Sequence, residues 1–171
     1  MTYNLHPIFV HFPIALLTLY SVLAVLPFRK WFPNVNWRDI LFVLLAAGFF
    51  GAYLSTATGE TAEHLVRVDS NVLHAHTFFA AMSMWTYGLL FLGEALRVLD
   101  AKIKRLGFIS FLFPILDKVK NILQNKGVMF LLAALGFVAM LLTGLLGGVM
   151  VHGATADPLA PIVLRLLGIN A

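Results

Sequence analysis

Long apolar stretches separated by polar connectors dominate the hydropathy pattern of the chain. Four of them cover residues 8–28, 40–58, 72–96 and 128–151. Each has about the 20 residues that a helix, rising about 1.5 Å per residue, needs to cross a hydrocarbon layer. The pattern therefore predicts an all-α integral membrane protein, a four-helix up-down-up-down bundle.

The longest connector and the tail predict two further short helices. Between residues 99 and 126, the segment GFISFLFPILDKVKNIL interleaves apolar and basic residues. We expect it to form an amphipathic helix in the cytoplasmic interface. Pro114 and the nearby charges, including Asp117 and Lys118, leave its apolar run too short for a fifth span. The segment after residue 156 is expected to form a short external helix.

Composition agrees with this interpretation and limits the domain count. Hydrophobic residues make up 60% of the 171 positions and charged residues only 12%, which is typical of a membrane protein. The spans use about half the chain and leave only connectors and a tail, so residues 1–171 are interpreted as one domain. We expect the first span to be retained, because no basic segment precedes it and it is longer than the apolar part of a signal peptide.

The distribution of basic residues predicts the orientation. Ten of the twelve Lys and Arg residues fall in the connectors after the first and third spans, and only Arg67 and Arg165 lie on the other side. Because Lys and Arg mark the cytoplasmic side, both termini are expected on the periplasmic side of a bacterial inner membrane. Orientation and anionic headgroups explain these charges, so nucleic-acid binding is not indicated.

All histidines fall at the predicted external ends of the spans. They are His6, His11, His64, His74, His76 and His152. Imidazole is the commonest metal ligand in proteins, and ionisable groups at membrane depth are candidates for function. The chain has no cysteine, which excludes covalent c-type haem and thiolate-ligated metal sites. The pattern predicts a cofactor site held by imidazoles alone.

Haem b with two axial imidazoles is the favoured cofactor. His11 and His74 are the preferred axial pair, because each is predicted just inside the hydrocarbon edge at a similar depth. Each also shares a helical stripe with small or mildly polar residues, which should point into the bundle. The sequence leaves open whether one or two haems are bound.

The other histidines receive secondary roles. His64 and His152 form the second candidate pair, and His6 is a reserve ligand. Arg67 is a candidate partner for the haem propionates. His76 lies two residues from the preferred ligand on its helix, so it is expected to point elsewhere, toward solvent or a partner.

Two alternatives to a haem protein remain open. A copper, zinc or iron site for binding or transport would use the same histidines, or a mixed set of Glu60, Glu63 and His64 with His11 or His74. The chain would otherwise be an accessory subunit of a larger respiratory or photosynthetic complex. No nucleophile–base pair is evident, so a carrier or subunit is favoured over a stand-alone enzyme.

Small residues follow one face of two spans and predict close helix contacts. On the second span they are Gly48, Ala52, Ser55 and Gly59, and on the fourth Gly136, Met140, Gly144 and Gly148.

Several motifs together resemble a known bacterial family. LHPIFVHFPIALL opens the chain, TGETAEH ends the second span, a histidine-led segment begins the third and GGVMVHG ends the fourth. This order is similar to that of the four-helix membrane proteins grouped as domain of unknown function 2231. The resemblance implies a four-helix membrane domain with histidines near one face, to which His6, His11, His64, His74 and His152 correspond.

The same resemblance implies a redox role. The family's domain is sometimes fused to Rieske or c-type cytochrome domains, which favours electron transfer. With the histidine pattern, it predicts a cytochrome b-like protein that passes electrons between an external redox protein and a quinone or a larger membrane complex.

Overall fold

The computed structural model describes residues 6–63, 68–105, 107–155 and 157–169, apart from the side chains of residues 61–63 and 107–109. Within these residues the regular elements are all helical, which confirms the predicted fold class. They are α1 (His6–Val25), α2 (Phe28–Trp31), α3 (Trp37–Glu63), α4 (Ser70–Ile103), the 3-10 helix η1 (Gly107–Leu112), α5 (Phe113–Leu123), α6 (Lys126–His152) and α7 (Ala160–Leu166).

Helices α1, α3, α4 and α6 are each long and apolar enough to cross a membrane. Their outer surfaces carry large apolar side chains, such as Trp85, which is 74% exposed. Several boundaries differ from the prediction, and α3 covers residues 37–63 instead of 40–58. Helix α1 ends at Val25, shortly before Pro27, whose ring lacks the N–H that a continuous helix needs. Helix α4 runs on to Ile103, because its last turns pack against α5.

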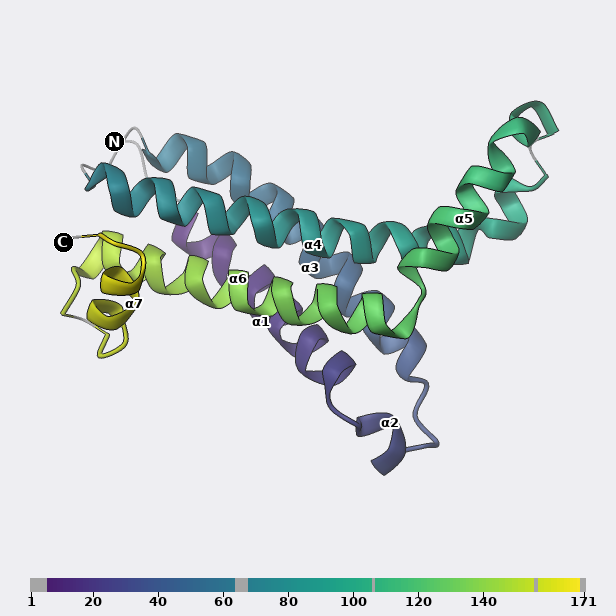
Figure 1. The fold of residues 1–171 in the computed structure, drawn as a ribbon, viewed down its shortest axis with the longest axis horizontal. Helices are drawn as coiled ribbons and strands as arrows, with labels where there is room; N and C mark the ends of the chain where they lie inside the picture. The colour runs from purple at the N-terminus through teal and green to yellow at the C-terminus, as the bar shows by residue number, and fades with distance from the viewer. Residues whose placement is uncertain (1–5, 64–67, 106, 156, 170–171) are drawn as a thin grey trace.

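The most extensive contacts join α1 to α3 and α4 to α6, and smaller ones join α1 to α6 and α3 to α4. His6, at the start of α1, lies beside Thr58 near the end of α3. His76, near the start of α4, lies beside Thr143 in the second half of α6. Each pair is therefore antiparallel, and these ends of the helices lie near both chain termini (Figure 1). We call this the histidine end.

Two tyrosines and several leucines fill the centre of the bundle. Tyr20 and Tyr87 are buried, and their rings meet edge to face with centroids 6.3 Å apart. The Tyr87 hydroxyl lies 2.8 Å from the hydroxyl of Ser21 and donates a hydrogen bond to the Leu17 carbonyl at 3.4 Å, so it joins α4 to α1 through the core. Such pairing is needed, because a polar group without a partner is costly where no water is available.

The small residues of α3 form the predicted close contact with α1. A Cβ at Gly48 would lie 2.6 Å from Leu17 Cδ2, and a Cβ at Gly59 would lie 3.2 Å from the His6 ring. Between them, Ser55 Oγ donates hydrogen bonds to the backbone carbonyls of Phe9 and Gly51. The predicted close contact along the small-residue face of α3, which we call the α3 seam, is confirmed.

The predicted seam on α6 is only half right. A Cβ at Gly136 would lie 2.8 Å from Thr86 Oγ1, but one at Gly144 or Gly148 would meet no atom within 4 Å. A step of four residues drifts by about 40° around a helix, so positions at constant spacing of four leave the contact face. On α3 the spacing alternates between four and three, and the seam stays on one face.

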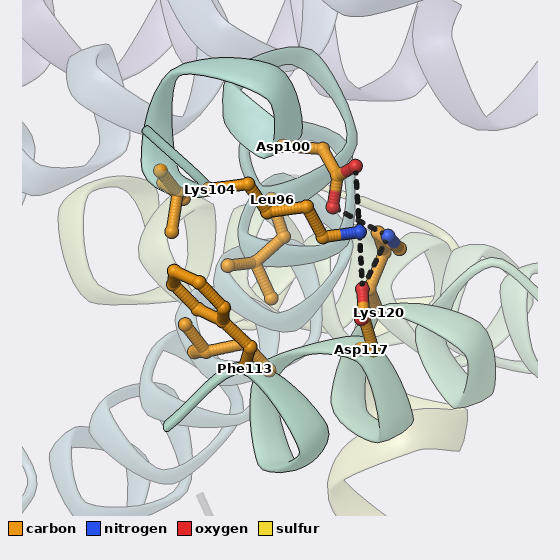
Figure 2. A pocket seen from close by; sticks show the side chains of 8 residues that line it. Leu96, Asp100, Lys104, Phe113, Asp117 and Lys120 are labelled. Atoms are coloured by element: carbon orange, nitrogen blue, oxygen red, sulfur yellow. Dashed lines mark hydrogen bonds and ion pairs between the residues drawn. The ribbon is translucent and has the colours of Figure 1, made fainter. Parts of the chain in front are cut away.

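Helix α5 is amphipathic as predicted and packs antiparallel along the last turns of α4 (Figure 1). A Cβ at Gly93 would lie 2.8 Å from Leu123 Cβ at one end of this contact. At the other end, Lys120 Nζ lies 2.6 Å from Asp100 and 2.7 Å from Asp117, and Lys104 bonds the same two carboxylates. Figure 2 shows this network of two lysines and two aspartates. It ties α5 to α4.

The predicted helix of the tail is α7. Its buried residues Ala160 and Leu164 pack with Val72 of α4 and with Leu146 and Val149 of α6. Helix α7 therefore lies over the histidine end of the α4–α6 pair (Figure 1).

Candidate functional site

His6 is half-buried at the first residue of α1 and is held by α3. Its Nδ1 lies 3.0 Å from Thr58 Oγ1. The Thr58 hydroxyl also bonds the Ser55 carbonyl at 3.0 Å, and the His6 ring forms a hydrogen bond with the Ser55 backbone as well. Gly59 leaves the space that the ring occupies.

His76 has the corresponding arrangement on the other helix pair. It is half-buried on α4, and its Nδ1 lies 3.0 Å from the backbone oxygen of Thr143 on α6. A carbonyl oxygen only accepts, so His76 carries its proton on Nδ1. A Cβ at Gly147 would lie 3.4 Å from Cε1 of this ring. The expectation that His76 points to solvent or a partner is wrong.

Both inward histidines thus bond an oxygen of the neighbouring helix through Nδ1. In His76, where the partner is a carbonyl and Nδ1 carries the proton, Nε2 holds the lone pair that can bind a metal. An Nδ1–H hydrogen bond to an oxygen acceptor is the usual support of a metal-binding imidazole, because it fixes the ring and raises its basicity. Both rings lie at the histidine end, His6 on α1 and His76 on α4.

His11 and His74, the pair preferred from the sequence, lie on outward faces. Both are exposed, and His11 Nδ1 bonds the carbonyl of Pro7 in its own helix. Ala15 and Ala81, on the same stripes, are exposed too. The prediction that these stripes point into the bundle is wrong, because the buried faces of α1 and α4 follow His6 and His76 instead.

The remaining candidates are only partly placed. His152 is exposed at the end of α6, where Gly153 terminates the helix with φ 81°. Glu60 is exposed at the end of α3. His64, Arg67 and the side chain of Glu63 lie outside the described residues. Within the described part of the chain, no three His, Asp or Glu side chains gather as a metal-ion site.

The oxygens that hold the histidines were not identified from the sequence. Thr58 and Thr143 sit in apolar helices, where a threonine commonly bonds the carbonyl a turn earlier, as both do here. A clearer signal was available on α4, where His76 is followed by polar or aromatic residues at 83, 86 and 87, all of which are buried. That stripe marks the inward face.

Comparison with known proteins identifies one family. The family model described as "Predicted membrane protein (DUF2231)" matches residues 2–156. No curated protein and no solved structure matches the chain.

Proposed function

The chain belongs to the DUF2231 family of predicted membrane proteins, and from this premise we propose that it is a multi-pass electron carrier that binds haem b. The observation that carries the proposal is the pair of inward imidazoles at the histidine end. His6 and His76 come from different helices and each bonds an oxygen of the neighbouring helix through Nδ1, so Nε2 is the electron-pair donor that we propose for both.

The chemistry of this donor set fits haem better than a bare metal ion. Haem iron needs only two axial protein ligands, because the macrocycle supplies the other four. Each imidazole is supported by an oxygen on the neighbouring helix, Thr58 Oγ1 or the Thr143 carbonyl. With no cysteine in the chain, the group would be held without covalent attachment. When bound, it would supply one-electron transfer.

The burial of the histidines changes the ligands that we propose, and the rest of the sequence-based hypothesis stays a proposal. His6 and His76 become the primary pair, and His11 and His74 the alternative. His64 with His152 remains the candidate second pair, and Arg67 remains the proposed partner of the propionates. The proposed electron partners are an external redox protein and a quinone or larger membrane complex.

The orientation belongs to the same proposal. The histidine end would face the periplasm of a bacterial inner membrane, because the connectors at the opposite ends of the spans carry ten of the twelve basic residues. Electrons would then enter or leave at the external face.

Absorbance spectroscopy of the detergent-purified protein tests the cofactor and its ligands together. We expect a Soret band, sharpened visible bands on reduction, and haem that pyridine extraction releases. His6→Ala and His76→Ala should each abolish the low-spin spectrum. His11→Ala and His74→Ala are matched controls from outward positions on the same two helices and should leave the spectrum nearly intact.

The outcomes separate the hypotheses. Loss of haem in the His11 and His74 variants, with normal spectra in the His6 and His76 variants, would assign the ligands to the sequence-based pair. Purified protein without Soret absorption that holds stoichiometric copper, zinc or iron would replace haem by a metal-ion site. Circular dichroism of each variant shows whether a lost spectrum reflects lost ligation or lost folding.

A further inference from the structure

A groove separates α5 from the start of α6, at the end of the bundle opposite the histidines. It has a volume of about 590 Å³. Pro114, Ile122 and Val128 form its apolar wall, and Lys118, Asn121 and Asn125 contribute polar groups. The groove therefore offers an apolar surface and hydrogen-bond donors side by side, as an amphiphilic ligand requires.

Its electrostatic character is positive. Lys118 is exposed, and no ion pair joins it to a carboxylate within the described residues. Asp117 also lines the groove, but its carboxylate bonds Lys120 at 2.7 Å and Lys104 at 3.3 Å (Figure 2). These hydrogen bonds, first from Lys120 and then from Lys104, lower the pKa of Asp117. Its charge is offset, which leaves Lys118 to attract an anion.

The start of α6 relates the groove to the expected edge of the hydrocarbon layer. Helix α6 begins at Lys126, and its apolar run starts at Val128, a groove residue. Asn125 caps this helix through Oδ1, which accepts hydrogen bonds from the backbone N–H groups of Gly127 and Val128. Its Nδ2 amide is the group that can donate to a ligand. In a bilayer whose hydrocarbon begins with the apolar run of α6, the polar groups would lie at headgroup depth and Val128 at the hydrocarbon edge.

From this placement we propose that the α5–α6 groove binds an anionic phospholipid of the leaflet on the basic side of the bundle. Lys118 pairs with the headgroup phosphate, Asn121 and Asn125 donate hydrogen bonds to it, and the first part of an acyl chain lies along Ile122 and Val128. A lipid is the occupant favoured over free phosphate, because the groove continues along the hydrocarbon-facing start of α6 and its wall is apolar.

Thermal denaturation of the full-length protein in a neutral detergent tests this site. Phosphatidylglycerol, phosphatidylcholine and inorganic phosphate are titrated separately, and the apparent affinity is taken from the concentration dependence of the midpoint. Lys118→Gln removes the groove cation. Lys102→Gln removes an exposed lysine of α4 that does not line the groove, and serves as the matched control.

We expect phosphatidylglycerol to stabilise the wild type, and Lys118→Gln to weaken its apparent affinity about fivefold, the equivalent of roughly 1 kcal/mol per basic residue at a lipid surface. Lys102→Gln should retain the wild-type response. Equal stabilisation by phosphatidylcholine or by inorganic phosphate would overturn the lipid assignment. An equal loss of affinity in both lysine variants would show a diffuse surface charge effect and would overturn the groove.

Discussion

Gly136 lies where α4 and α6 approach closely, and a single methyl group there tests the packing of these two helices. A Cβ at Gly136 would lie 2.8 Å from Thr86 Oγ1 and 3.0 Å from Tyr87 Cζ. Neither neighbour can yield easily. Thr86 bonds the carbonyls of Met82 and Ser83, and the ring of Tyr87 is rigid and buried.

The size of the effect follows from comparing two glycines of the same helix. Overpacking a core costs about 1–3 kcal/mol, whereas glycine to alanine in a helix interior gains about 1 kcal/mol of helix propensity. Gly144→Ala should gain helix propensity without any steric cost, because a Cβ there would have no neighbouring atom within 4 Å. Both variants gain the same helix propensity, so this gain does not affect the comparison. The free energy of unfolding of Gly136→Ala should therefore be about 1–3 kcal/mol lower than that of Gly144→Ala.

Reversible unfolding in mixed micelles, followed by far-ultraviolet circular dichroism, measures this difference in the free energy of unfolding. Comparing the two alanine variants with each other, rather than only with the wild type, isolates the steric contribution. Equal stability of the two variants would refute the close approach of α6 to Thr86 and Tyr87.

Three further predictions follow from other parts of the molecule. In a double-mutant cycle of Ser21→Ala and Tyr87→Phe, the same unfolding assay should give a coupling energy of about 0.6 kcal/mol and no more than about 1.7; zero coupling would contradict the 2.8 Å hydrogen bond. Because the folded-state pKa of Asp117 is lowered, its contribution to α4–α5 packing is complete above the ordinary value of 3.8 and is lost as the pH falls through the lowered value. Since the pKa of Lys120 is raised, its contribution to the same packing is complete below pH 10.5 and is lost as the pH rises through the raised value. The protection of the α5 amides from hydrogen exchange should therefore be greater in the wild type than in Asp117→Asn. This difference in protection should be constant at neutral pH and should disappear in acid. Reporter fusions at Asn34 and Lys104 should behave as cytoplasmic and a fusion after Ala171 as external, and the opposite signals would reverse the orientation.

The elements of the fold were predictable because they depend on features that a linear sequence displays. Long apolar runs mark α1, α3, α4 and α6, and the interleaved charges around Asp117 mark α5. The seam on α3 was predictable too, since Gly48 and Gly59 lie on one face at alternating spacing. Each of these depends on local composition or on a regular repeat.

The inward faces of α1 and α4 were not predictable in the same way. A soluble helix hides its apolar side, but a membrane helix is apolar all round, so polarity does not distinguish His6 from His11 or His74 from His76. Small residues beside His11 suggested an inward face, yet the first span packs through Leu17 and Tyr20. The choice depends on which neighbour each helix meets, and that is a tertiary property.

The division of the bundle into two helix pairs has a consequence for assembly. His6 bonds Thr58 within the α1–α3 hairpin, and His76 bonds the Thr143 carbonyl within the α4–α6 hairpin. Each hairpin can therefore insert into the bilayer with its own imidazole already oriented, before the halves meet. The proposed haem, bound to both imidazoles, would link the two hairpins, so that its binding would be thermodynamically coupled to completion of the bundle.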